Sequence, residues 1–215
     1  MAVQIEDRPN QGSGSIKYID GFPFAGIGSG GFEAGEDLHI IGDALDNFLE
    51  GGAGHDEIDG DAGNDVIKGG DGNGILRGDD GDDDLDGQEG TEKLFGGNGN
   101  DILRAGGSKP VIIDGSTLVQ GDFDRLTGGD GNDTFGFYGF GSFEITDFKV
   151  GQDRLFFDSE ILGIHSFAEL APFITDVIDN GDSGFTAVFV GGAASIELVG
   201  VNVNSLTLDM IVFHL

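Results

Sequence analysis

Oxygen-bearing side chains recur at a fixed interval through residues 42–104. This stretch divides without remainder into seven nonapeptides, each of which begins with glycine and has leucine or isoleucine at its eighth position. Six of the seven units carry a carboxylate or an amide at the sixth position. Such oxygens, together with the carbonyl groups of glycine-rich turns, are the ligands that a hard cation prefers. The sixth-position candidates are Asn47, Asp56, Asp65, Asp83, Glu92 and Asp101.

The charge of this stretch also points to a cation. Residues 42–104 contain 18 aspartate or glutamate residues but only 4 lysine or arginine residues. Without a partner these charges repel one another and favour an open chain. Burial of one leucine or isoleucine per nine residues does not offset the entropy lost when the nine are ordered. A bound metal would supply the missing free energy, and we expect calcium, because calcium tolerates irregular oxygen shells whereas magnesium requires an octahedron.

The elements that must position these oxygens are short strands joined by tight turns. One apolar position in nine does not form an amphipathic helix, and glycine supplies the positive φ that tight turns need. The units resemble the RTX (repeats-in-toxin) nonapeptide G-G-x-G-x-D-x-U-x, most closely at residues 51–59 (GGAGHDEID), 96–104 (GGNGNDILR) and 128–136 (GGDGNDTFG).

The resemblance implies an all-β fold, a right-handed parallel β-roll (a β-solenoid) in which two nonapeptides make one turn. The apolar U residues would pack inside, and several Ca²⁺ ions would lie between loops stacked one turn apart. The turn glycines that would offer carbonyl ligands are Gly52, Gly54, Gly63, Gly72, Gly81, Gly97 and Gly99.

Because stacked units would be eighteen residues apart, the sixth positions separate into two rows. The first row reads Asn47, Asp65, Asp83 and Asp101, and we expect well-filled calcium sites along its aspartates, with Asn47 as a weaker, neutral end. The second row reads Asp56, Gly74 and Glu92. Glycine has no side chain to offer and glutamate is one methylene too long, so we expect weak or absent sites around Gly74 and a lopsided roll.

The chain divides into three parts. Residues 1–41 are interpreted as an N-terminal cap or arm, since solenoids need capped ends. Residues 42–136 form the predicted roll, with an irregular insertion at about 105–127 where the register breaks. A degenerate unit at 119–127 contributes Asp124, and the unit at 128–136 contributes Asp133. Residues 137–215 are interpreted as a C-terminal cap with a secretion signal.

The C-terminal part contains a second resemblance. Residues 145–155 are similar to the segment that follows the roll in RTX proteins, and there Asp147 and Asp153 would either bind a last calcium ion or cap turns. Residues 160–180 predict a short or kinked helix with Ser166 as N-cap and Pro172 inside it. Two strands follow, FTAVFV and ASIELVGV. The tail at 208–215 resembles the C-terminal signal of some type I secretion substrates, serralysins among them, and is equally readable as a last strand.

Composition excludes several classes of function. A formal charge of −30 opposes binding to nucleic acid, and no cysteine is present for disulfides or thiolate chemistry. No stretch of the sequence is apolar enough for a transmembrane segment, and the first residues do not form a secretory leader. The zinc motif H-E-x-x-H and the hydrolase motif G-x-S-x-G are both missing, so we predict no enzyme. His55 is interpreted as the variable fifth residue of a repeat.

The leading hypothesis is a secreted, extracellular or cell-surface calcium-binding protein that is not an enzyme. The resemblance implies export by a type I secretion apparatus, after which Ca²⁺ would fold the roll. A start at Met1 without a linker favours a self-standing surface or matrix component. Two alternatives stay open: an accessory carbohydrate-binding or secretion module of a larger exoenzyme, which would bind polysaccharide, and a self-assembling surface-layer or filament subunit, whose partner is another copy.

Overall fold

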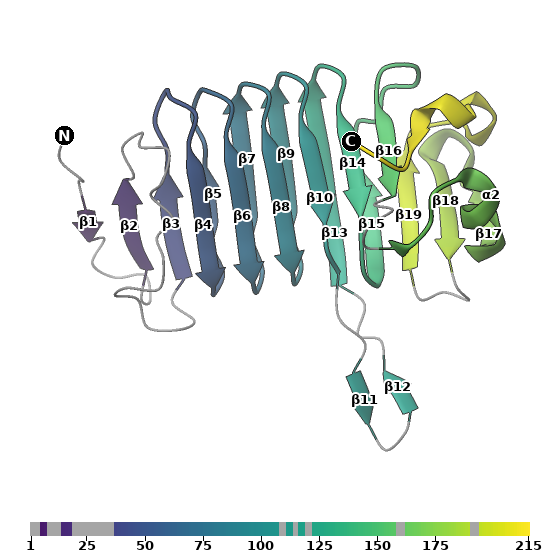
Figure 1. Ribbon diagram of the computed structural model, residues 1–215, viewed down its shortest axis with the longest axis horizontal. Coiled ribbons are helices and arrows are strands. Elements are labelled where there is room, and N and C mark those ends of the chain that lie inside the picture. Colours follow the sequence, from purple (N-terminus) through teal and green to yellow (C-terminus); the bar gives the residue numbers. More distant parts are fainter. Residues whose placement is uncertain are drawn as a thin grey trace.

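The computed structural model describes residues 5–7, 14–18, 37–107, 111–113, 116–118, 122–157, 162–189 and 194–215. Within these residues the chain winds back and forth between two sheets that face each other, and successive coils stack along the long axis of the molecule (Figure 1). The fold is therefore an all-β parallel β-roll, as predicted.

Each unit of the repeat places its strand and its turn at fixed positions. In β6 (Val66–Asp71) and β7 (Ile75–Asp80), the strand runs from the seventh residue of one unit to the third residue of the next. The fourth to sixth residues make the turn. Burial alternates along the strand, so the eighth residue and the following first-position glycine point inward. Because glycine has no side chain, the two sheets can lie close together at that level.

Odd-numbered and even-numbered repeat strands lie in different sheets. The larger sheet has 11 strands, in the order β1 (Ile5–Asp7), β2 (Gly14–Tyr18), β3 (Asp37–Ile41), β5 (Glu57–Asp59), β7, β9 (Lys93–Asn98), β13 (Asp122–Asp130), β15 (Gly141–Ile145), β19 (Ala194–Val199), β18 (Gly184–Phe189) and β17 (Ile174–Asp179). The smaller sheet has 7, in the order β20 (Ile211–Val212), β16 (Arg154–Phe157), β14 (Thr134–Phe137), β10 (Ile102–Ala105), β8 (Asp84–Glu89), β6 and β4 (Phe48–Ala53).

The register between strands is the predicted eighteen residues. Ile58 pairs with Leu76 and Leu76 with Leu94 in the larger sheet, and both pairings are parallel. The eighth-position side chains consequently stack in the centre of the roll. Each is 0% exposed, and together they form the core of the repeat: Leu49, Ile58, Ile67, Leu76, Leu85, Leu94 and Leu103.

An insertion interrupts this register once. Leu126 of β13 pairs with Leu94, which lies 32 residues earlier instead of 18. Part of the difference is a hairpin of β11 (Val111–Ile113) and β12 (Ser116–Leu118), which projects from one rim of the roll (Figure 1). The insertion is shorter than the expected 105–127, because residues 122–127 already lie in β13.

The two sheets also extend beyond residues 42–136. At the N-terminal end, β3 pairs with β5, and Ile40 occupies the eighth-position level of a further unit. Residues 19–36 of the expected cap lie outside the described residues. At the C-terminal end, β15, β16, β19 and β20 continue the stack, so the predicted secretion tail is itself partly a strand.

The helix predicted within 160–180 is short, as expected. Between Ser166 and Ile174 the helical elements are α2 (Phe167–Leu170) and a 3₁₀ turn (Ala171–Phe173), and Ile174 begins β17. Ser166 is the N-cap residue, but its side chain makes no capping hydrogen bond. Pro172 ends the helical run, because its ring cannot continue the hydrogen-bond pattern, and the apolar residues after it pair with β18 instead. The two strands predicted after the helix are present as β18 and β19.

Further short helical segments close the C-terminal region, and an aromatic cluster fills it. The segments are 3₁₀ turns at Gly181–Ser183, Val203–Ser205 and Leu208–Met210. Phe137 packs against Phe143 with ring centroids 5.2 Å apart, and Phe157 packs against Phe189 at 6.0 Å. These rings form the core beyond the end of the stack of leucine and isoleucine side chains.

Candidate metal centre

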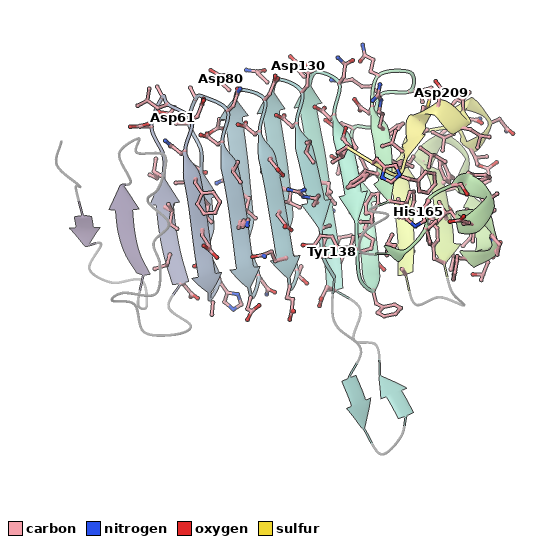
Figure 2. All side chains as sticks on the ribbon, viewed as in Figure 1. Asp61, Asp80, Asp130, Tyr138, His165 and Asp209 are labelled. Atoms are coloured by element: carbon pink, nitrogen blue, oxygen red, sulfur yellow. The ribbon has the colours of Figure 1, made fainter. Side chains whose placement is uncertain are left out.

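The turns of the repeat lie on two opposite rims. The first rim is the row of turns whose sixth-position residues are Asn47, Asp65, Asp83, Asp101 and Asp133. The second rim is the row of turns whose sixth-position residues are Asp56, Gly74, Glu92 and Asp124. Asp61, Asp80 and Asp130 belong to units of the first rim and stand along one edge of the molecule (Figure 2).

Sixth-position aspartates of the first rim link successive coils. The Oδ1 atom of Asp65 accepts a hydrogen bond from the backbone N–H of Asn47 at 2.7 Å, and Asp83 and Asp101 accept in the same way from Asp65 (2.8 Å) and Asp83 (2.9 Å). The row continues across the insertion, where Asp133 accepts from Asp101 at 3.1 Å. All four aspartates are buried.

The second carboxylate oxygen of each of these aspartates is buried without a hydrogen-bond partner among the described residues. These atoms are Oδ2 of Asp65, Asp83, Asp101 and Asp133. A buried carboxylate oxygen is stable only when a donor or a metal faces it. The free oxygens therefore fit a row of cations.

First-position glycines make the room for these oxygens. A Cβ at Gly60 or Gly78 would collide with Oδ2 of the aspartate five residues later, and it would meet the carbonyl oxygen of the glycine one coil further on at 2.7 Å. Side-chain oxygen and backbone carbonyl thus converge on the same small space. Oxygen ligands of both kinds are what calcium takes.

Burial makes the ionised aspartates costly unless a cation is bound. Burial raises the pKa of Asp65 and of Asp101 to about 7, and the pKa of Asp83 to about 6, against an ordinary value of 3.8. The negative charge of neighbouring aspartates adds to this rise in each case. A divalent cation in the row would reverse both effects.

The predicted turn glycines have the backbone conformation that such a row needs. Gly63, Gly81 and Gly99 hold the fourth position with φ of 115°, 147° and 137°. The carbonyl oxygen of Gly63 faces the Cα of Gly81, and that of Gly81 faces the Cα of Gly99, so these carbonyls point along the stack. The other predicted glycines, Gly52, Gly54, Gly72 and Gly97, also have positive φ.

The second rim is interrupted. Asp56 accepts from the N–H of Leu38 at 2.8 Å, but the following position is Gly74. Beyond it, the atom of Glu92 nearest to where a Cβ on Gly87 would lie is Cγ, not a carboxylate oxygen. Its Oε1 lies instead 2.8 Å from where a Cβ on Gly90 would lie. Burial, with the charge of Asp124 beside it, raises the pKa of Glu92 above its ordinary value.

Asp124 belongs to the second rim, as the degenerate unit predicted. Its Oδ1 accepts from the N–H of Glu92 at 2.8 Å, and its Oδ2 has no hydrogen-bond partner among the described residues. The second rim thus offers carboxylates at both ends of a gap, whereas the first rim offers an unbroken row.

Sequence reasoning missed a second row of side chains at the fifth position. His55 Nδ1 accepts from the N–H of Asn73 at 3.1 Å, and Asp82 Oδ1 accepts from the N–H of Asn100 at 2.8 Å. These bonds run toward the following coil, opposite in direction to those of the sixth position. His55 is therefore a stacking residue. The available signal was that the fifth residue of each unit at 42–104 can accept a hydrogen bond.

One further group of metal-type side chains lies on the outer face of the larger sheet. His39 Nε2 is 3.2 Å from Asp59, and Glu57 is the third member of the group. Arg77 binds both carboxylates, at 2.7 Å from Asp59 and 2.8 Å from Glu57. A cation already occupies this group, so it does not form a second metal centre.

Comparisons with known proteins agree with this geometry. A family model described as the RTX calcium-binding nonapeptide repeat (4 copies) matches residues 41–76, 68–103 and 120–136. No curated protein matched the chain.

Two solved structures are similar in part. Extracellular lipase LipA from Serratia marcescens shares 15% identity with a TM-score of 0.29, and the match covers 91% of this chain but 42% of the lipase. The AlgE6R3 subunit of the Azotobacter vinelandii mannuronan C5-epimerase shares 22% identity with a TM-score of 0.30, covering 78% of this chain and 79% of that one. The chain thus spans less than half the length of the lipase.

The repeat region is a structural module that binds Ca²⁺ and is not itself catalytic. Register, buried carboxylates and glycine turns all follow the nonapeptide that the family model describes. Residues 41–103 and 120–136 of this chain therefore match the RTX calcium-binding nonapeptide repeat in sequence and in the geometry of their turns.

Proposed function

We propose that this protein is a secreted, non-enzymatic calcium-binding protein whose roll folds when Ca²⁺ binds after export. The observation that carries the proposal is the row of buried aspartates on the first rim, each with one oxygen bonded to the neighbouring coil and one oxygen free. Calcium bound to the free oxygens would join successive coils. Metal binding and folding are then a single event.

Export by a type I apparatus is the second part of this proposal. At low calcium the acidic repeats repel one another, so the chain is extended enough to be threaded through a type I apparatus. Outside the cell, calcium near the roughly 10⁻⁴–10⁻³ M affinities of extracellular modules folds it. None of the described helices is long and apolar enough to cross a bilayer. A role at the cell surface or in the matrix, polysaccharide binding and self-association stay predictions.

The test is far-UV circular dichroism of the purified chain during a calcium titration, with magnesium as control. We expect a cooperative gain of β signal with calcium and none with magnesium at the same concentration, because the irregular oxygen cradle does not suit an octahedral ion. A chain that is fully folded in chelator, and unchanged by calcium, would contradict the folding switch.

A further inference from the structure

The last coil of the first rim differs from the coils before it. Asp153 continues the row, since its Oδ1 accepts from the N–H of Asp133 at 2.9 Å. Its Oδ2, however, accepts from the backbone N–H of Lys149 at 2.7 Å. Unlike the aspartates before it, Asp153 has a hydrogen-bond donor on each of its two carboxylate oxygens.

A second carboxylate, that of Asp147, accepts hydrogen bonds from the backbone of the last unit. Asp147 accepts from the N–H of Gly128 at 2.9 Å and from the N–H of Gly129 at 2.8 Å, one bond to each oxygen. These two glycines hold the first and second positions of the unit at 128–136. Each carboxylate oxygen of Asp147 thus accepts one backbone N–H at the end of the stack.

A cation then takes the carbonyl of the same unit. In the preceding coil the carbonyl oxygen of Gly97 faces the Cα of Gly129, along the stack. The equivalent carbonyl of Gly129 instead accepts a hydrogen bond from the ammonium group of Lys149. That ammonium is also 3.8 Å from Oδ1 of Asp130. Its oxygen neighbours are thus a turn carbonyl and a carboxylate, as those of a bound metal ion would be.

The surroundings of Lys149 are strongly acidic. A shallow groove of about 500 Å³ runs along the first rim, and among the described residues that line it Lys149 is the sole basic side chain. The acidic residues of the groove are Asp79, Asp80, Asp130 and Asp147.

We propose that Lys149 is a built-in substitute for a calcium ion. Its ammonium provides the positive charge in the last interval of the first rim, between the turn that ends at Asp133 and the closing segment 147–153. In that interval the ammonium stands in for the metal, also as the cation for the free Oδ2 of Asp133, and Asp147 and Asp153 cap turns instead of holding a last ion. The proposal rests on the proposed calcium function of the rest of the row.

The experiment counts bound calcium by equilibrium dialysis with elemental analysis. Lys149→Asp replaces the ammonium by a carboxylate and should bind about one more ion per chain than the wild type, because the interval then has an acidic oxygen in place of a cation. Lys93→Asp is the matched control. Lys93 lies on β9 and is exposed, and its replacement changes the net charge equally without adding a site. Equal ion counts in the two variants would overturn the proposal.

A second pair of variants covers the case in which Lys149→Asp does not fold. Lys149→Met removes the charge but keeps the length, and it should raise the calcium midpoint of folding about threefold relative to Lys93→Met, as expected for a partly exposed ionic contact. Lys149→Arg should leave the midpoint unchanged. Equal midpoints for the two methionine variants would overturn the role of Lys149, whereas a wild-type chain that binds no calcium would overturn the proposed function instead.

Discussion

The sixth-position aspartate has two tasks, one for each oxygen. In Asp83, Oδ1 holds the N–H of Asp65 in the previous coil, and Oδ2 lies over Gly78 without a hydrogen-bond partner. At Asn47, the neutral end of the row, Oδ1 accepts instead from the N–H of Asp43 in its own unit at 2.8 Å, and an amide supplies no charge. Glutamate reaches too far, as at Glu92. Aspartate is the side chain whose length and charge suit both tasks.

Replacement of Asp83 by alanine should raise the calcium midpoint of folding. The change leaves the buried N–H of Asp65 without its acceptor, at a cost of roughly 1–3 kcal/mol, which corresponds to about a 5- to 150-fold change in an equilibrium constant. The measurement is the calcium titration by circular dichroism.

Asp82→Ala is the control for that variant. Asp82 is the neighbouring residue and accepts its hydrogen bonds at the exposed surface, so its loss should shift the midpoint much less. If the Asp82 and Asp83 variants had equal midpoints, the sixth position of the first rim would not be the calcium row.

At the scale of the element, the repeating unit is a strand whose two ends are held by different rims. The first rim is a continuous row from Asn47 to Asp133, whereas the second rim lacks a carboxylate at Gly74. Strands β6 and β7 are therefore joined by a turn with no sixth-position side chain. This turn is the weakest link between coils on the second rim.

Gly74→Asp should repair the second rim. Gly74 does not have positive φ, and a Cβ built there would come no closer than 3.3 Å to the end of the Leu76 side chain, 3.7 Å to Glu92 Cγ and 3.8 Å to the carbonyl oxygen of Asp56. An aspartate fits this space and restores an oxygen between Asp56 and Glu92. We expect a lower calcium midpoint and about one more bound ion per chain. Gly74→Ala adds the Cβ without the oxygen, and an equal response from both variants would refute the repair.

For the whole molecule, the buried row makes stability depend on pH in opposite ways with and without metal. Asp65, Asp83 and Asp101 have raised pKa values in the metal-free fold, about 6 to 7, against 3.8 ordinarily. Between pH 3.8 and pH about 7 the metal-free fold binds more protons than the unfolded chain does. Its free energy of unfolding therefore falls as the pH rises through this window.

We expect the calcium-free chain to be more folded at pH 4 than at pH 8, and the calcium midpoint to rise as the pH falls below about 6, since calcium binds the ionised carboxylates. Circular dichroism of the metal-free chain across this range measures the first effect. A variant with asparagine at positions 65, 83 and 101 keeps the Oδ1 hydrogen bonds and should lose most of the pH dependence. A metal-free chain whose signal did not change between pH 4 and pH 8 would contradict the expectation.

How much of this protein was predictable depends on the range of the interactions. The nonapeptide by itself determined the strands, the turns and the inward leucines, because each of these repeats a local choice: glycine at positive φ, one apolar residue in nine, and an acidic turn. The eighteen-residue register followed from the resemblance of the units to RTX repeats. The same register placed Asp65, Asp83 and Asp101 in one row and located the gap at Gly74 in the other.

The tertiary structure alone decided what happens where the repeat stops. The apolar pattern after Ser166 suits a helix, yet Ile174–Asp179 is a strand, because β18 offers it backbone partners that the local sequence does not reveal. The fifth-position row, the shift of register at β13 and the placement of the Lys149 ammonium on the Gly129 carbonyl are likewise contacts between residues 18 to 32 apart. Periodicity carries information about neighbouring coils only while it continues, so the end of the roll depends on contacts that no repeat encodes.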